Sequence, residues 1–323
     1  MKQSKVLIIG SGVAGLTTAK AILEAGQGHH VTICSKETPN QNPETSANAY
    51  ALWVPYKDDI DPRIEGWTDA SLAAFQEISR ESDSGVILRN NYNLQTQRHE
   101  PWYADKYSFF RHAVDGEVTD EYLDAWVLEN VPVIDPPKYL LWLKVKLAML
   151  GACFTQKEFK DFETMPTGYD VVINCTGGGA VDLVGDDQIT PLHLQVVTVE
   201  NNGFDRVVVD DVGPNSMVCI VPHGNYIKVG AVMSEGLDQP FVDDFATLDI
   251  LERCSKVHPD FKVSARNVIN VVCASRPNRD RPRVELDSLS DGRPLIHNYG
   301  HGSTGFITSH GVAATIVQEI AAL

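Results

Sequence analysis

Three glycines near the start of the chain have the spacing of a dinucleotide-binding turn. Gly10, Gly12 and Gly15 follow the β-branched run 5–9 and precede an apolar run of helical spacing that ends at Gly26. In such a turn the first glycine allows the tight bend, the second lets backbone approach a pyrophosphate, and the third lets the helix pack on its strand. The helix amides then face the phosphates. The pattern predicts a dinucleotide site without distinguishing FAD from NAD.

A second glycine-containing segment closes a buried apolar run. Residues 170–176 end in Asn174, Cys175 and Thr176, and three glycines follow at 177–179. This composition suits a backbone packed against a flat cofactor at the carboxyl ends of a parallel sheet, with an ordinary turn as the alternative. Cys175 has no neighbouring base, so we expect an inert buried thiol and not a nucleophile.

Metal, nucleic-acid and membrane chemistry are not expected. His297 and His301 are spaced like metal ligands, but no carboxylate or cysteine accompanies them. The formal net charge of −16 would repel phosphate backbones and anionic lipids, and no apolar run approaches the roughly 20 residues of a membrane span. The six cysteines are scattered and form no CxxC pair, which indicates reduced thiols and a cytoplasmic protein.

These residues require two kinds of element to position them. The run 5–9, the glycine turn, its helix and the run 30–34 form a strand–helix–strand unit, and helices are expected over 69–80, 139–150 and 309–323. Alternating runs over 190–278, with one helix over 243–257, predict an antiparallel sheet. We expect an α/β fold in which a Rossmann-type cofactor domain (1–56, 136–190, 280–323) is interleaved with an α+β substrate domain built on that antiparallel sheet (57–135, 191–279).

Five segments spread over the chain carry a further pattern. They are VLIIGSGVAGLTTA, SANAYALWVPY, YDVVINCTG, Ser275–Pro277 with the following PRVE, and IHNYGHGSTGF. Taken in order, they resemble the D-amino-acid oxidase and D-aspartate oxidase family, whose members have a glutathione-reductase-like Rossmann fold. The resemblance implies noncovalent FAD and oxidation of a D-amino acid to an imino acid, which yields a 2-oxo acid and ammonia. Molecular oxygen would be reduced to hydrogen peroxide.

By position, the resemblance also implies which residues contact FAD. The pyrophosphate would meet Gly10, Ser11, Gly12, Val13, Ala14 and Gly15, and the adenosine would meet Ser35, Lys36, Glu158 and Phe159. The flavin would lie beside Thr45, Ser46, Leu52, Trp53, Cys175, Thr176, Gly177, Gly302, Ser303, Thr304, Gly305, Phe306 and Ile307. The helix that begins near Ser309 would direct its positive end toward the pyrimidine side of the flavin.

The resemblance assigns the substrate carboxylate to Arg276, whose planar guanidinium matches a carboxylate in a bidentate pair. The Ser303 carbonyl would accept from the substrate amine, and Cys219 and Met233 would line the side-chain pocket. With a neutral amine and the α-hydrogen directed at flavin N5, hydride transfer needs orientation and electrostatics but no catalytic base. The alternative is that Arg276 belongs to a solvated basic face with its neighbours Arg279, Arg281 and Arg283.

The chain departs from its relatives at the substrate end. Cys219 and Met233 stand where the family has tyrosines over the substrate, and Tyr226 and Tyr50 are the candidates to fill that space. The departure keeps other substrates open: a secondary, glycine-like or specialised biosynthetic amine, or an acidic D-amino acid. For the acidic substrate His223 and Lys228 would supply the second cation, and their alternative is a surface position on a strand. A non-catalytic flavin-binding module is a further alternative. The expected partners are an amino acid or amine, oxygen and a second copy of the chain in a homodimer.

Overall fold

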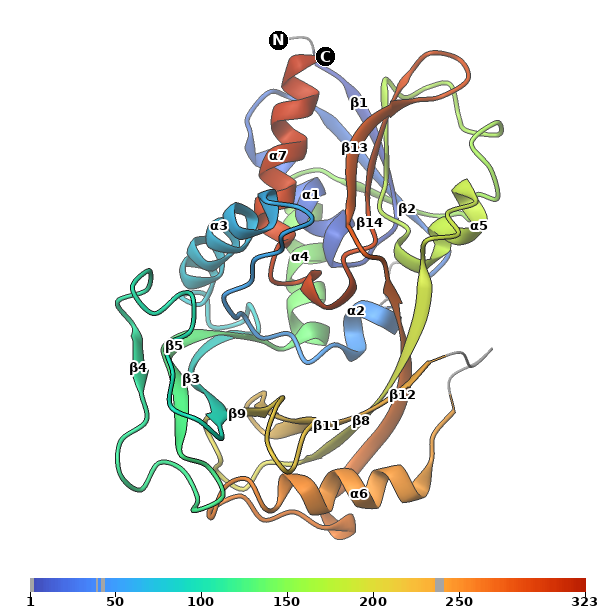
Figure 1. Ribbon diagram of the computed structural model, residues 1–323. Helices are drawn as coiled ribbons and strands as arrows, with labels where there is room; N and C mark the ends of the chain where they lie inside the picture. Colours follow the sequence, from blue (N-terminus) through green and yellow to red (C-terminus); the bar gives the residue numbers. More distant parts are fainter. Residues whose placement is uncertain (1–2, 39, 42–43, 236–240) are drawn as a thin grey trace.

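The computed structural model contains two β-sheets joined by helices (Figure 1), and it describes residues 3–38, 40–41, 44–235 and 241–323. The smaller sheet lies in the upper half of the view with α1, α3 and α7 beside it, and the larger sheet lies below. The chain passes between the two sheets several times. The α/β fold expected from the sequence, a Rossmann-type unit interleaved with an antiparallel sheet, is confirmed.

The smaller sheet is parallel except at one edge. Its strand order is β13-β14-β7-β1-β2-β6, and only β13 runs antiparallel to its neighbour. The strands are β1 (Lys5–Ile9), β2 (His30–Ser35), β6 (Cys153–Gln156), β7 (Val171–Asn174), β13 (Arg283–Ser288) and β14 (Pro294–Tyr299). The central strands are buried on both faces, as their β-branched runs require. The main helices are α1 (Val13–Glu24), α3 (Arg63–Ile78), α4 (Pro136–Met149) and α7 (Ser309–Ala322).

The larger sheet has the order β12-β8-β11-β10-β9-β3-β5-β4, and all its pairs are antiparallel except β3 with β9. The strands are β3 (Val86–Gln95), β4 (Phe110–His112), β5 (Asp124–Ile134), β8 (Thr190–Glu200), β9 (Val207–Asp210), β10 (Val218–Pro222), β11 (Tyr226–Glu235) and β12 (Val268–Asn278). Helix α6 (Asp244–Cys254) covers one face, where Ile250 and Leu251 pack with Val197 and Val199. Because side chains alternate along a strand, the other face of β8 is turned away from α6.

The remaining elements are short. They are α2 (Glu44–Asn48), α5 (Ala180–Val184) and three 3₁₀ turns, η1 (Gly177–Gly179), η2 (Ala265–Asn267) and η3 (Gly302–Thr304). Figure 1 shows α2 on the side of the larger sheet opposite α6. No helix within the described ranges combines the length and the apolarity that a bilayer crossing requires.

The segment 57–135 differs from expectation. Its sequence predicts a helix over 69–80 and no strand, but the segment contains the long strands β3 and β5, which pair with each other. The middle of β3 is Arg89, Asn90, Asn91 and Tyr92, so no apolar alternation marks it as a strand. All strands of the smaller sheet fall within 1–56, 136–190 and 280–323, and all strands of the larger sheet fall within 57–135 and 190–279. The domain boundaries themselves stay a prediction.

Candidate cofactor and substrate site

The glycine turn between β1 and α1 is built around three different requirements. Gly10 has a φ of +115°, and a Cβ there would lie 2.2 Å from the carbonyl oxygen of Cys175. A Cβ on Gly15 would lie 2.1 Å from the carbonyl oxygen of Gly10, whereas one on Gly12 would meet only Ser46 Oγ, at 3.1 Å. The first and third glycines are therefore fixed by the protein's own packing. The second is the one that leaves backbone accessible, as a bound pyrophosphate requires.

Polar groups beside this turn fit the same ligand. The Ser11 hydroxyl is buried and has no hydrogen-bond partner within the described part of the chain. The Val13 amide, in the first turn of α1, donates to Ser46 Oγ at 3.1 Å. A helix N-terminus and an unpartnered hydroxyl suit an anionic group such as a diphosphate.

Cys175 lies directly against the glycine turn. Its amide donates to the Ile9 carbonyl at 2.8 Å, and its Cβ is 3.4 Å from the position of a Cβ on Gly15. Burial raises the pKa of the Cys175 thiol to about 12. The neutral thiol therefore packs, in agreement with the inert role expected of it. The next residue, Thr176, bonds Asn174 Oδ1 through its hydroxyl at 2.7 Å, and η1 follows.

The four residues expected at the adenosine lie together at one edge of the smaller sheet. Ser35 ends β2 and pairs with Gln156 at the end of β6, and the Lys157 amide donates to the Ser35 carbonyl at 2.9 Å. Lys36 follows Ser35, and Glu158 and Phe159 follow Lys157. Their approach results from the parallel pairing of β2 and β6, strands distant in sequence. Their contact with adenosine stays a prediction.

The segment 45–53 connects the two sheets. Thr45 Oγ1 donates to the Ser275 carbonyl at 3.1 Å, which places Thr45 beside the strand that carries Arg276. Leu52 forms an isolated bridge with Val133 of β5. The Trp53 indole is fully buried among Leu72, Tyr107 and other apolar residues, and its Nε1 donates to the Thr68 carbonyl at 2.9 Å. Trp53 thus anchors this segment, and its ring is not available to a ligand.

The glycine-rich turn 302–307 closes the site from the C-terminal side. η3 packs against β12, with Ser303 exposed and Thr304, Phe306 and Ile307 buried. Helix α7 begins at Ser309, as expected. The amides of His310 and Gly311 donate to Ser71 Oγ at 3.1 and 3.2 Å. No pattern in the sequence marks Ser71 for this role, because it lies in the middle of α3.

Arg276 shares one face of the larger sheet with Cys219 and Met233. These two residues stand where the family has tyrosines over the substrate, and we call them the lid positions. Arg276 pairs with Leu192, Met233 pairs with Leu194, and Cys219 pairs with Gly230, which in turn pairs with Val196. The even-numbered residues 192, 194 and 196 of β8 project from a single face, and directly paired residues project from the same face. This is the face opposite α6, because the odd-numbered Gln195 bonds the carbonyl of Asp243 and the hydroxyl of Thr247, at the start of α6.

The four neighbouring arginines do not form one solvated face. Arg279 pairs with Asp186, Arg281 with Asp61, and Arg283 with Glu285 and Asp287. Arg276 has no ion pair within the described residues, and its Nε is buried without a hydrogen-bond partner. Burial lowers the pKa of the Arg276 guanidinium, and the field of Tyr50 partly opposes that shift. The interpretation as a solvated basic face is therefore wrong for Arg276.

The two candidates for a second cation are buried, so their interpretation as surface residues is wrong. Lys228 is 6% exposed and His223 2% exposed. Lys228 Nζ donates to the carbonyls of Ala47 and Ala49 at 3.1 and 2.7 Å, and burial lowers its pKa to about 8. Burial lowers the pKa of His223 to about 3, so its imidazole is neutral near pH 7. His223 therefore offers no positive charge to a second carboxylate.

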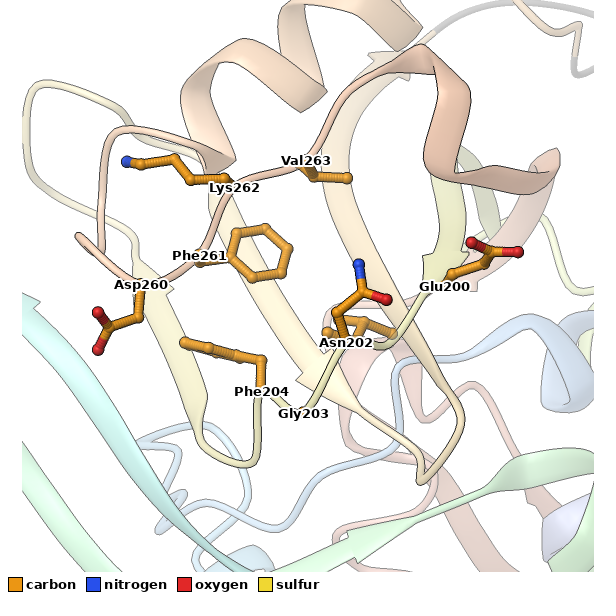
Figure 2. Close-up of a pocket in the computed structure, with 9 residues that line it drawn as sticks. Glu200, Asn202, Gly203, Phe204, Asp260, Phe261, Lys262 and Val263 are labelled. Atoms are coloured by element: carbon orange, nitrogen blue, oxygen red, sulfur yellow. The ribbon is translucent and has the colours of Figure 1, made fainter.

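A surface pocket of about 210 Å³ lies elsewhere on the larger sheet. Figure 2 shows Phe204, Phe261, Asn202 and Glu200 around it. Glu200 is the last residue of β8, eight residues beyond Leu192, the partner of Arg276. At about 3.3 Å per residue this separation is roughly 26 Å. The pocket is thus distinct from the candidate substrate site.

Comparisons with known proteins agree with this geometry. A family model described as FAD dependent oxidoreductase matches residues 5–319. A D-amino-acid oxidase of Rubrobacter xylanophilus is 32% identical over 99% of this chain and 95% of its own length. Human D-aspartate oxidase is 28% identical over 99% of this chain and 96% of its own length. Among solved structures, glycine oxidase from Bacillus cereus superposes with a TM-score of 0.80 at 18% identity, covering 99% of this chain and 98% of that chain.

Proposed function

We propose that this chain, which belongs to the family of FAD dependent oxidoreductases and is an FAD-dependent enzyme, oxidises D-amino acids to imino acids. One observation supports a substrate that carries a carboxylate, as an amino acid does. Arg276 presents a half-buried guanidinium whose buried Nε has no partner among the described residues, next to the segment expected to carry the cofactor. A substrate carboxylate would satisfy it.

The chain's residues bind and orient the substrate. FAD, when bound, supplies the acceptor for the two electrons that leave with the substrate's α-hydrogen. The turn Gly10–Gly15 would hold its diphosphate side, and the residues named above around 45–52, 175–177 and 302–307 would surround its ring. Arg276 would hold the carboxylate, the Ser303 carbonyl would accept from the amine, and Cys219 and Met233 would lie beside the substrate side chain. Met233 is 41% exposed, so it would form the rim of that space.

Substrates with an uncharged side chain suit the site best. A second carboxylate would need a second cation, and His223 is neutral while Lys228 already donates to two backbone carbonyls. This disfavours an acidic D-amino acid as the main substrate. A secondary, glycine-like or specialised amine is the remaining alternative, since it too can carry the carboxylate that Arg276 would bind.

We further propose an electron acceptor, a compartment and an assembly for this enzyme. Molecular oxygen would reoxidise the cofactor and leave as hydrogen peroxide. All six cysteines are free thiols, which supports a reducing compartment such as the cytoplasm. A homodimer is proposed as the assembly.

The visible spectrum of the purified protein, recorded without oxygen, tests the proposal. We expect a flavin band that a pool of neutral D-amino acids bleaches and the matching L pool does not. Separate additions of D-aspartate, glycine and N-methylglycine distinguish the alternatives. A flavin band unaffected by every D-amino acid would contradict the proposed substrate class.

A further inference from the structure

The Tyr50 side chain ends in a polar group that the protein itself does not satisfy. Its hydroxyl oxygen is buried and has no hydrogen-bond partner in the described part of the chain. Buried tyrosine hydroxyls normally find a partner, since burying one without a hydrogen bond is unfavourable. Tyr226, the other candidate for the missing lid, donates to Asp135 Oδ1 at 2.8 Å and is therefore already satisfied.

The Tyr50 hydroxyl lies over the face of the larger sheet that carries Arg276. A Cβ on Gly230 would come within 1.9 Å of it, so the hydroxyl occupies the place of a side chain on β11. Gly230 pairs with Cys219, and Tyr50, Leu52 and Cys219 pack in one cluster. Glycine at position 230 is thus what makes room for Tyr50.

The backbone around Tyr50 is held in place from both sides. Lys228 Nζ donates to the carbonyls of Ala47 and Ala49, just before Tyr50. Just after it, Ala51 has a φ of +51°, and the amide of Ile134 donates to its carbonyl at 2.7 Å. The left-handed conformation costs a residue with a Cβ roughly 1–2 kcal/mol, so the surrounding bonds must impose it. The orientation of Tyr50 is therefore built into the fold.

Two unsatisfied polar groups thus face the same region. Arg276 Nε and the Tyr50 hydroxyl are both buried and unpartnered, and each side chain influences the other electrostatically. A guanidinium only donates, whereas a carboxylate has about four acceptor positions on two oxygens. One carboxylate can accept from both groups, and charge-assisted bonds of this kind are stronger than neutral ones.

We propose that Tyr50 is a substrate-binding residue whose hydroxyl donates a hydrogen bond to the carboxylate held by Arg276. This inference rests on the proposed function. It adds that Tyr50, from a different part of the chain, takes the place of the missing lid tyrosines. Tyr50 reaches the substrate from the segment between α2 and α3, whereas Cys219 and Met233 on the sheet strands supply no hydroxyl.

The test measures binding without turnover. The probe is 2-aminoisobutyrate, an amino acid that has no α-hydrogen and so cannot be oxidised at that carbon. Its dissociation constant is measured by equilibrium dialysis with the flavin-loaded protein, for the native chain, Tyr50→Phe, Tyr226→Phe and Arg276→Ala. We expect about a tenfold weaker affinity for Tyr50→Phe, the worth of one hydrogen bond to a charged group. Tyr226→Phe, which removes a hydroxyl bonded within the protein, should bind as the native chain does.

A second pair of variants separates a bond from a structural effect. In the double variant Tyr50→Phe/Arg276→Ala, the loss caused by the tyrosine change should be smaller than in the native background, since both groups hold one carboxylate. Gly230→Ala should also weaken binding, because its Cβ displaces an intact tyrosine. If Tyr50→Phe does not fold, which the absence of a flavin spectrum would reveal, Gly230→Ala tests the role of Tyr50 in its place.

The outcomes distinguish this inference from the proposed function. Native affinity in Tyr50→Phe, together with a large loss in Arg276→Ala, overturns the role of Tyr50 and leaves the proposed function intact. Equal losses in Tyr50→Phe and Tyr226→Phe also overturn that role. If the native protein binds no 2-aminoisobutyrate and is not reduced by D-amino acids, the proposed function falls and this inference with it.

Discussion

The unpaired charge of Arg276 is the residue-scale feature on which the proposed function depends. Arg276 is half-buried, and taking a guanidinium even partly out of water without an anion beside it lowers the stability of the folded chain. The other three arginines of its segment all have carboxylate partners. Such an exception among neighbouring arginines is typical of a ligand-binding position, where stability is lost for the sake of function.

Arg276→Ala should therefore separate activity from stability. We expect the KM for a D-amino acid to rise roughly 100-fold, because truncating a buried charge-assisted contact removes about 3 kcal/mol of binding. The free energy of unfolding without substrate should not fall, since an uncompensated charge has been removed. Steady-state kinetics and denaturant titration measure the two quantities.

Arg281→Ala is the matched control for that change. The Arg281 side chain is 53% exposed and lies 3.7 Å from Asp61. Its substitution by alanine therefore removes the same charge from the same segment without affecting the carboxylate site. Its KM should stay at the native value. A similar rise in KM for both variants would show that net charge, and not the Arg276 contact, determines substrate affinity.

At the scale of elements, the close contact of α3 with α7 positions the C-terminal side of the site. A Cβ on Gly311 would lie 2.3 Å from the Cα of Trp67, and Ser71 of α3 accepts from the first free amides of α7. The two helices can approach this closely only because position 311 has no side chain. Their packing in turn sets where the turn 302–307 ends.

Gly311→Ala should push these helices apart. We expect a loss of about 1–3 kcal/mol in the free energy of unfolding, the usual effect of overpacking. Gly66→Ala, at an exposed position of α3 with no atom within 4 Å of the added Cβ, should instead stabilise the protein by up to about 1 kcal/mol. Chemical denaturation compares the two, and equal effects of the same sign would refute the proposed role of Gly311.

The buried amine of Lys228, on β11, makes the stability of the fold depend on pH. The pKa of Lys228 is lowered from an ordinary value of 10.5 to about 8, chiefly by burial. The unfolded chain therefore holds this proton more tightly, and the resulting penalty is fully present below about pH 8 and disappears as the pH rises toward 10.5. Relative to Lys228→Met, the native protein should gain about 2 kcal/mol of stability between pH 7 and pH 10. A pH-independent difference between the two proteins would contradict a depressed pKa.

At the scale of the whole molecule, the chain crosses between two sheets and would bind the cofactor largely through one of them. Contacts expected for FAD come from segments near residues 10, 35, 46, 158, 175 and 305, which lie far apart in sequence. Ligand binding at such a site stabilises the entire fold, because only the folded chain brings these segments together.

Free FAD should therefore raise the stability of cofactor-depleted protein. At a concentration 100 times its Kd we expect a gain of about 2.7 kcal/mol in the free energy of unfolding. Gly12→Val should lose this gain, since its branched side chain occupies the space through which backbone approaches the pyrophosphate. Denaturant titration with and without FAD gives the comparison, and an undiminished gain in Gly12→Val would place the diphosphate elsewhere.

The sequence alone determined what depends on neighbouring residues. The turn Gly10–Gly15, the strands on either side of α1, and the helix that starts at Ser309 were all predicted, since each depends on local spacing and short-range packing. The family resemblance followed from the same short segments. Strand β3 was not predicted, because a polar run becomes a strand here only through its pairing with β5 and β9.

The tertiary structure decided which groups face one another. The sequence could not show that Arg276 lacks a partner while Arg279 has one, that Tyr50 and not Tyr226 has an unsatisfied hydroxyl, or that Ser71 binds the start of α7. Each of these facts depends on sheet register and helix packing between segments far apart in the chain. Local sequence composition does not predict such contacts, because they form only when the two sheets and their helices pack together.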